Sequence, residues 1–380
     1  MSFLSSVIGH PAERVAIVDQ QDFYTYGELV LQARHLAATL KDEGVNQGEV
    51  VAYLADNGVW SVIAMLGIWL AEAVAMPFDS RLGPVSLREK MHKVKGRCVV
   101  RSYHPIEDGF FQRALDDLKW VSTVTKHKNP LPLKLTRDES RALLLFTESG
   151  SAHTSPVVIT FSALSARARL LAQTWGVEPN DHMMHLLSMA KMSGISSVLC
   201  AMAAGATCKL CHNSEEMGER IVRDSSELLV VDEQAYGDLL GLWQSSAIDF
   251  KSKKDTRLVV ISETPQVSEI GQHWCQLTGV TQMLGFGLVE SGMVLSMDIS
   301  EQHPDALIGV PLSGVSIRIV SDSGKPLTSS VGELEVRSPQ LFSGYAHEDT
   351  VNTDVFHHGW FKTDIIAFKQ PDGCYQLVGE

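Results

Sequence analysis

Small and hydroxyl-bearing residues gather at one point of the chain, at Thr147, Ser149, Gly150 and Ser151. Such residues suit a phosphate-binding loop, because the backbone N–H groups of small residues can close around a triphosphate and hydroxyls can donate further hydrogen bonds. A phosphate loop also needs a cation to offset the charge of its ligand. The nearby His153 is a weak substitute, since an ordinary imidazole is mostly neutral at about pH 7. The same residues would equally suit a polar loop between two strands.

A second group with possible metal chemistry is the Cys-x-x-Cys pair of Cys208 and Cys211. A zinc site would need two further ligands, and His212 is too close in sequence to serve as a third. If this segment is a strand, its alternation directs the two thiols to opposite faces. We therefore predict buried or half-buried thiols and no zinc site.

The elements that must position these residues begin with alternating strands and helices. Thr25 and Glu28 form a capping box, which predicts the start of a helix, and apolar residues continue at helical spacing until Gly44. Apolar runs predict the other elements of this half, which are strands at Arg14–Asp19, Val50–Leu54, Ala73–Pro77 and Cys98–Arg101 and helices at Trp60–Leu70 and Ser86–Lys93. This alternation predicts a parallel sheet covered by helices.

A second α/β run follows, and the chain then changes character. Apolar segments predict strands at Leu143–Phe146, Leu228–Val231 and Leu258–Ile261, separated by helical stretches. Strict alternation in Val315–Val320 and Gly332–Arg337 predicts a small antiparallel β unit near the C-terminus. We therefore divide the chain into a first α/β subdomain (1–140), a second that carries the loop (141–305), and a small β subdomain (306–380).

Composition narrows the function classes. The chain has 380 residues, of which 44% are hydrophobic and 20% charged, as in ordinary globular proteins. A net charge of −13 argues against nucleic-acid or anionic-membrane partners. The N-terminus has no signal-peptide pattern, and Glu72 and Pro77 interrupt the apolar stretch 59–78, so we expect no membrane span. Six scattered cysteines fit a reducing compartment, and we expect a cytoplasmic protein.

Four ordered stretches carry a resemblance to a known family. They are Leu145-Phe-Thr-Glu-Ser-Gly-Ser, Gly285-Phe-Gly-Leu-Val-Glu-Ser-Gly-Met, Gly309-Val-Pro-Leu-Ser-Gly with the later Gly332-Glu-Leu-Glu-Val-Arg, and Gly359-Trp-Phe-Lys-Thr-Asp. In this order they resemble the adenylate-forming superfamily of acyl-CoA synthetases. Within it, the second stretch and Gly205-Ala-Thr-Cys are most similar to malonyl-CoA synthetases.

The resemblance implies a fold and a set of site residues. It implies the large N-terminal domain of these enzymes, an α/β fold with two helix-flanked, mostly parallel sheets and a small antiparallel β unit. It implies that ATP or AMP binds with Mg²⁺, with Thr147, Ser149, Gly150 and Ser151 around the phosphates. Phe286 and Gly287 would meet the adenine, and Glu290 would coordinate the metal. Asp364 would bind the ribose if one glycine is deleted from the fourth stretch, and otherwise Ile365 takes its place.

Several positions depart from the family's pattern. Val157 stands where the loop lysine belongs, and Val289 stands where a threonine hydroxyl would bond phosphate. Gly285 replaces the arginine of malonyl-CoA synthetases, so malonate selectivity is not supported. Glu380 reverses the charge of an arginine, and the family's small C-terminal domain, with its catalytic lysine, is expected to be absent.

The segment that usually forms the substrate pocket reads Ser188–Gly194 and is also altered. Lys191 is the one charged group within it that could contact an acid substrate. A lysine solvated at the surface is the favoured interpretation.

These departures lead to three hypotheses. The first is a non-catalytic or strongly impaired homologue, a pseudoenzyme with no catalytic residue assigned that acts as a binding or interaction module. The second is an adenylating ligase that activates a small carboxylic acid with ATP, forming an acyl adenylate and then an acyl-CoA, with a small domain supplied in trans by a partner protein. The third is a truncated product without a function of its own.

Overall fold

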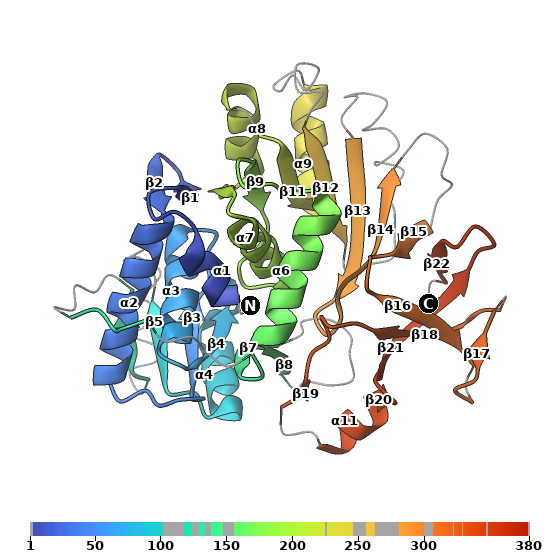
Figure 1. Cartoon of the computed structure of the whole chain (residues 1–380), viewed down its shortest axis with the longest axis horizontal. Coiled ribbons are helices and arrows are strands. Elements are labelled where there is room, and N and C mark those ends of the chain that lie inside the picture. The colour runs from blue at the N-terminus through green and yellow to red at the C-terminus, as the bar shows by residue number, and fades with distance from the viewer. Residues whose placement is uncertain are drawn as a thin grey trace.

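Two β-sheets with helices packed between and around them make up the molecule (Figure 1). The computed structural model describes residues 3–101, 118–123, 129–133, 138–146, 156–224, 226–245, 256–262, 281–299, 307–321, 323–328, 330–346 and 349–378. Its helices are α1 (Phe3–Gly9), α2 (Tyr26–Asp42), α3 (Val59–Leu70), α4 (Gly83–Val94), α6 (Phe161–Trp175), α7 (Met192–Ala204), α8 (Ser214–Arg223), α9 (Glu233–Gln244) and α11 (Asp349–Val355).

The smaller sheet has seven strands in the order β19-β8-β7-β4-β3-β5-β6. Their bounds are β3 (Val50–Leu54), β4 (Val74–Phe78), β5 (Cys98–Arg101), β6 (Trp120–Ser122), β7 (Arg141–Leu145), β8 (Val157–Thr160) and β19 (Gly344–Tyr345). The central strands β3 and β4 are parallel and buried along their whole length, as expected for strands covered on both faces.

The larger sheet contains the other 15 strands that the structure describes. Its strands are β1 (Val15–Asp19), β2 (Asp22–Thr25), β9 (His182–Leu186), β10 (Thr207–Leu210), β11 (Leu228–Asp232), β12 (Arg257–Ser262), β13 (Thr281–Leu288), β14 (Gly292–Ile299), β15 (Leu307–Pro311), β16 (Ser316–Val320), β17 (Pro326–Leu327), β18 (Gly332–Arg337), β20 (Phe356–His357), β21 (Trp360–Lys369) and β22 (Tyr375–Leu377). From β1 through β10, β9, β11 and β12 to β13 the pairing is parallel, and from β13 onward it is antiparallel.

This architecture confirms the predicted α/β class with two helix-flanked sheets and an antiparallel β unit. The antiparallel unit is not separate, because β15 pairs with both β14 and β22 and so continues the larger sheet. Sheet membership also does not follow chain order: β1 and β2 join the larger sheet, whereas β7 and β8 join the smaller one. The proposed subdomain boundaries therefore stay a prediction.

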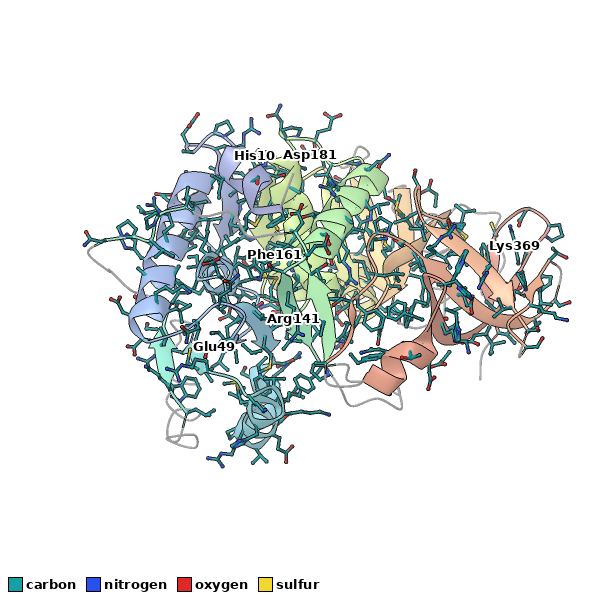
Figure 2. The ribbon with its side chains drawn as sticks, turned by 60° about the horizontal axis from the view of Figure 1, so that its bottom comes forward. His10, Glu49, Arg141, Phe161, Asp181 and Lys369 are labelled. Carbon is teal, nitrogen blue, oxygen red and sulfur yellow. The ribbon has the colours of Figure 1, made fainter. Side chains whose placement is uncertain are left out.

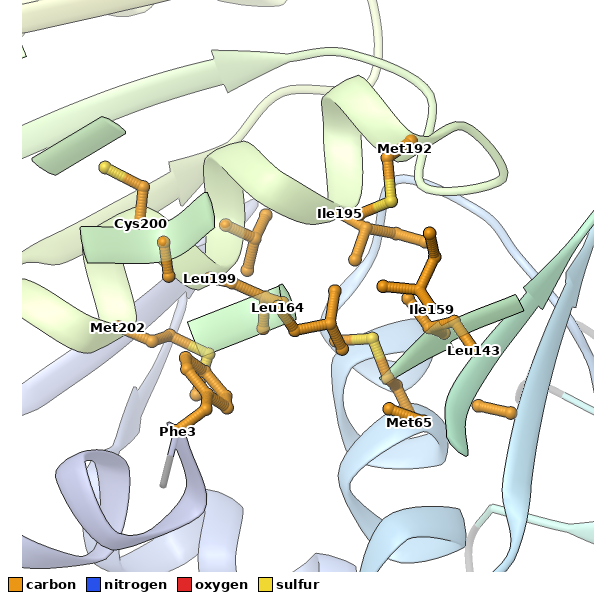
Figure 3. Close-up of a cluster of buried hydrophobic side chains, with 14 of the residues drawn as sticks. Phe3, Met65, Leu143, Ile159, Leu164, Met192, Ile195, Leu199, Cys200 and Met202 are labelled. Carbon is orange, nitrogen blue, oxygen red and sulfur yellow. The ribbon is translucent and has the colours of Figure 1, made fainter. Parts of the chain in front are cut away.

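The main hydrophobic core lies between the two sheets. Figure 3 shows part of it, with side chains from α1, α3, α6 and α7 in one cluster that includes Phe3, Leu164 and Met202. The indole of Trp69 packs edge-on against Phe3 and Phe161, and its N–H donates to the Ala142 carbonyl at 2.8 Å. Phe161 lies near the centre of Figure 2, whereas His10, Asp181 and Lys369 lie at its periphery. The core thus fixes the middle of α6 and the start of α7, which both contribute to the site described below.

Local sequence signals are confirmed where the structure describes them. Thr25 caps α2, and its hydroxyl accepts from the Glu28 amide while the Glu28 carboxylate accepts from the Thr25 amide. Cys208 and Cys211 are both buried, and they belong to different hydrophobic clusters on opposite faces of the larger sheet. Within the described residues, no cluster of metal-ligating side chains is found and no helix is long and apolar enough to cross a membrane.

A hydrogen-bonded pair, Asp19 and His212, connects three elements across the sheets. The His212 Nε2–H donates to Asp19 Oδ1 at 2.8 Å, and Asp19 Oδ2 accepts from the Val59 amide at 2.8 Å. Asp19 therefore caps α3, whose own N-cap Gly58 has no side chain to do so. This hydrogen bond raises the pKa of His212, with Glu216 and Asp56 adding to the effect. Burial alone would raise the pKa of Asp19, but its bonds to His212 and Val59 outweigh burial and lower it.

The Asp19–His212 pair predicts a defined pH dependence of stability. The His212 contribution is complete below its ordinary pKa of 6.5 and is lost as pH rises through the raised value. The Asp19 contribution is complete above its ordinary pKa of 3.8 and is lost as pH falls through the lowered value. We expect His212→Ala to lose about 1–2 kcal/mol of unfolding free energy at about pH 5.5 and less at about pH 9, measured by urea unfolding. His92→Ala, on the exposed face of α4, is the control, and an equal loss for His212→Ala at both pH values would contradict the assignment.

Candidate nucleotide site

The site lies where the parallel strands of the larger sheet end. The carboxyl ends of β12 and β13 meet at one edge of this sheet, next to the start of α7. In open α/β sheets, this edge is where ligands generally bind. The β13–β14 turn, residues 289–291, carries Val289 and Glu290 of the second sequence stretch.

The predicted phosphate residues Thr147, Ser149, Gly150 and Ser151 lie outside the described residues. On either side of them, Leu145 at the end of β7 pairs with Val157 at the start of β8. Val157 is fully buried and also pairs with Tyr345 of β19. An apolar side chain enclosed in this way cannot offset phosphate charge.

Phe286 and Gly287 lie at the end of β13. Phe286 is 1% exposed and belongs to the main core, so its ring offers no free face in this conformation, and its adenine contact stays a prediction. Gly287 faces Met293 across a bulge in the β13–β14 pairing. A Cβ at Gly287 would fall on the Gly292 carbonyl oxygen, so only glycine permits this close approach of the two strands.

Glu290 is buried, with 6% of its surface exposed. Its Oε1 accepts a hydrogen bond from the Tyr345 hydroxyl at 3.0 Å, and its carbonyl accepts from the Phe342 amide at 2.8 Å. The turn is thereby tied to residues 342–345, which lead into β19. The carboxylate that the sequence predicts as a metal ligand thus already has a partner within the protein.

Arg167 is the functional residue that sequence reasoning missed. It lies on α6 and is 1% exposed, and its guanidinium donates to the Gln340 carbonyl at 2.9 Å and to the Glu290 carbonyl at 3.1 Å. Its Nη1 has no hydrogen-bond partner among the described residues. Burial lowers the pKa of Arg167 to about 9, and the negative charge of Glu290 opposes that shift. The sequence did contain a sign of its burial, because Arg167 lies at helical spacing between the apolar residues Leu164 and Leu171 and therefore on the buried face of the helix.

Asp364 reaches the same site from β21. It is exposed and has a left-handed φ of 58°, at an irregularity in the pairing of β18 with β21. Burial raises the pKa of the Tyr345 hydroxyl, and the negative charges of Glu290 and Asp364 raise it further. The structure therefore brings Glu290 and Asp364, far apart in the sequence, together around Tyr345.

A small apolar cavity of about 40 Å³ adjoins the turn. Its walls include Leu171, Met192, Ile261, Val289 and Met293, and its polar side chains are those of two serines on α7, Ser193 and Ser196. No described lining residue carries a charge. Lys191, the cation that the sequence offered for an acid substrate, is exposed at the start of α7 and is not part of the lining.

Comparison with known proteins agrees with this geometry. The family model described as AMP-binding enzyme matches residues 4–346. The chain belongs to the AMP-binding enzyme family. Among its relatives are the mitochondrial malonate–CoA ligase of Xenopus laevis, 22% identical, with 97% of this chain and 72% of that protein covered, and the malonate–CoA ligase of Arabidopsis thaliana, 20% identical, with 98% and 69% covered.

Solved structures show the same fold for this AMP-binding chain. Apo MatB from Rhodopseudomonas palustris matches with a TM-score of 0.88 at 19% identity, with 100% of this chain and 79% of that chain covered. The amide bond synthetase McbA from Marinactinospora thermotolerans matches with a TM-score of 0.86 at 20% identity, with 100% and 79% covered. The family match confirms the suspected AMP-binding, adenylate-forming family, and these structures confirm the fold of its large domain.

A substitution at Gly287 tests how closely β13 and β14 approach each other at this site. We expect Gly287→Ala to lower the free energy of unfolding by about 1–3 kcal/mol, because the new methyl group must displace the Gly292 backbone. Gly241→Ala is the matched control, since a Cβ at this position of α9 meets nothing within 4 Å, and it should stabilise the helix by about 0.5–1 kcal/mol. Chemical denaturation of both variants gives the comparison, and a neutral Gly287→Ala would mean that the strands are farther apart than described.

Proposed function

We propose that this chain is an acyl-CoA-synthetase-like AMP-binding domain that binds a small acyl ligand and is strongly impaired in adenylation. The observation that supports this best is the enclosure of Glu290, a residue that is 6% exposed and whose carboxylate is bonded to Tyr345. A carboxylate in this state has little freedom to coordinate Mg²⁺, which prefers open octahedral sites shared with water and phosphate oxygens.

The chemistry of adenylation supports the same proposal. The reaction joins a carboxylate to the α-phosphate of ATP and expels pyrophosphate, so two anions must meet. Its rate depends on cations and oriented donors around the phosphates. Here Val157 and Val289 are apolar at positions where the family has a lysine and a threonine. Each such loss typically lowers a rate by about 10²–10³, although losses within one cluster do not simply add.

The uncharged cavity suggests which acyl ligand fits. Its walls consist of aliphatic side chains, two methionines and two serine hydroxyls. No described lining residue has a positive charge that could pair with a second carboxylate. The chemistry of its lining therefore suits a short aliphatic monocarboxylate better than malonate, the acid named for several relatives. A cavity of about 40 Å³ must widen to admit such a ligand. The absence of an arginine at Gly285 is consistent with this preference.

The proposed function includes the binding of a nucleotide. Relatives in this fold include MatB with ATP bound and an O-succinylbenzoate CoA synthetase in complex with AMP. In this chain the residues available for the phosphates are Thr147, Ser149, Gly150 and Ser151, and Asp364 is available for the ribose. Free buried thiols such as Cys200 and Cys208 fit the proposed cytoplasmic location.

A second candidate is an adenylating ligase that activates a small carboxylic acid with ATP. The juxtaposition of Glu290 and Asp364 around Tyr345 favours it, because two acidic residues far apart in the sequence meet at the edge of the sheet where a nucleotide would bind. The malonate–CoA ligases among the relatives agree with it. ATP–pyrophosphate exchange with a small carboxylic acid at the rate of an active ligase would establish this candidate.

The proposal predicts ligand binding without turnover. With acetate, butyrate or malonate and Mg-ATP, we expect ATP–pyrophosphate exchange at least about 10²-fold below that of Rhodopseudomonas palustris MatB with malonate. Calorimetry should show butyrate binding and no malonate binding. Ser193→Phe should remove butyrate binding by filling the cavity, whereas Ser86→Phe on α4 should retain it. Exchange at the rate of MatB would refute the impairment, and malonate binding would refute the assigned cavity.

A further inference from the structure

The residues around Glu290 do not fit a magnesium site. The Glu290 carboxylate is enclosed beneath the β13–β14 turn and accepts from Tyr345 at 3.0 Å. Nucleotide-bound Mg²⁺ is usually held by one or two carboxylates together with water and phosphate oxygens, so the carboxylate must be open to solvent. Opening Glu290 to an ion would break the hydrogen bond from Tyr345 and release the turn.

A positive charge already lies under the same turn. Arg167 is 1% exposed, and its guanidinium donates to two neutral carbonyls, those of Glu290 and Gln340. These neutral acceptors orient the cation but do not balance its charge, and Nη1 has no acceptor among the described residues. A buried cation needs a negative charge nearby. The residue whose carbonyl Arg167 bonds at 3.1 Å, Glu290, carries the buried carboxylate that can supply it.

We propose that Arg167 is the built-in counter-charge of Glu290, standing in place of a divalent cation, and that ligand binding at this turn is independent of Mg²⁺. Two charges of opposite sign keep the enclosed region neutral. A divalent ion at Glu290 would be repelled by the fixed guanidinium, whose charge is poorly screened in the interior. Asp364 adds a further negative charge, but it is exposed and therefore screened by solvent. Arg167 is thus a positioning residue, and the inference extends the proposed function to the ion requirement of its site.

Titration with Mn²⁺ alone, followed by electron paramagnetic resonance, tests this directly. We expect the wild type and Glu290→Gln to bind Mn²⁺ identically, because Glu290 is not available to the ion. Arg167→Met, which keeps the volume and removes the charge, should gain a site at least about tenfold tighter than any in the wild type. In the double variant that carries both Arg167→Met and Glu290→Gln, this new Mn²⁺ site should be lost. Mn²⁺ binding by the wild type that is lost in Glu290→Gln would overturn the proposal.

A stability cycle checks the pair without any ion. Arg167→Met and Glu290→Gln should each destabilise the fold, and the double variant should be less destabilised than the sum, with a coupling of about tenfold in the unfolding equilibrium constant. Arg169→Met is the control, because Arg169 is exposed two residues farther along α6. Additive effects would overturn the proposal. If Arg167→Met does not fold, the Mn²⁺ comparison of the wild type with Glu290→Gln decides alone. No acid or nucleotide is present in either measurement, so failure here and failure of the proposed function are distinguishable.

Discussion

Two opposite charges buried beneath one turn set the main constraint on this site. Arg167 from α6 and Glu290 from the β13–β14 turn lie in the region where both sheets, α6 and the segment before β19 converge. Neither charge could stay in this interior without the other or an equivalent partner, since an isolated buried charge costs several kcal/mol. The hydrogen bonds of Arg167 to the Glu290 and Gln340 carbonyls, and of Tyr345 to the Glu290 carboxylate, tie the turn to α6 on one side and to residues 340–345 on the other. The position of the turn, and with it the wall of the apolar cavity, depends on this balance.

The packing and strand register of the rest of the fold position Arg167, Glu290 and Tyr345 close together. The core between the sheets fixes α6, because Leu164 and Phe161 of that helix pack with α1, α3 and α7. The register of β7 with β8 and of β8 with β19 then places Tyr345 beside Val157. Tyr345 is consequently the point at which the smaller sheet meets the end of β13 in the larger sheet. Packing in the core thus determines the hydrogen bond between Tyr345 and Glu290 at the edge of the larger sheet.

Sequence reasoning succeeds here where structure is local and fails where it is not. The capping box of Thr25, the buried strand Val50–Leu54 and the opposed thiols of Cys208 and Cys211 follow from periodicity and short-range hydrogen bonding. The enclosure of Glu290 could not be predicted, because its partners Tyr345 and Arg167 are 55 and 123 residues away in the chain. The sequence motif identified the family correctly, but the burial of Phe286 and the continuity of the two β regions depend on tertiary pairing.

The strand pair β13–β14 shows why selectivity at this site cannot be assigned one residue at a time. Gly285 stands where malonyl-CoA synthetases carry an arginine, and a Cβ at this position would meet the thioether of Met293 on the facing strand. Met293 in turn lines the apolar cavity. A larger residue at 285 therefore requires that Met293 move or shrink, so the two positions are coupled through space. The acid that the cavity accepts is decided jointly by both strands, and an arginine restored at 285 alone would first have to displace the side chain that makes the cavity apolar.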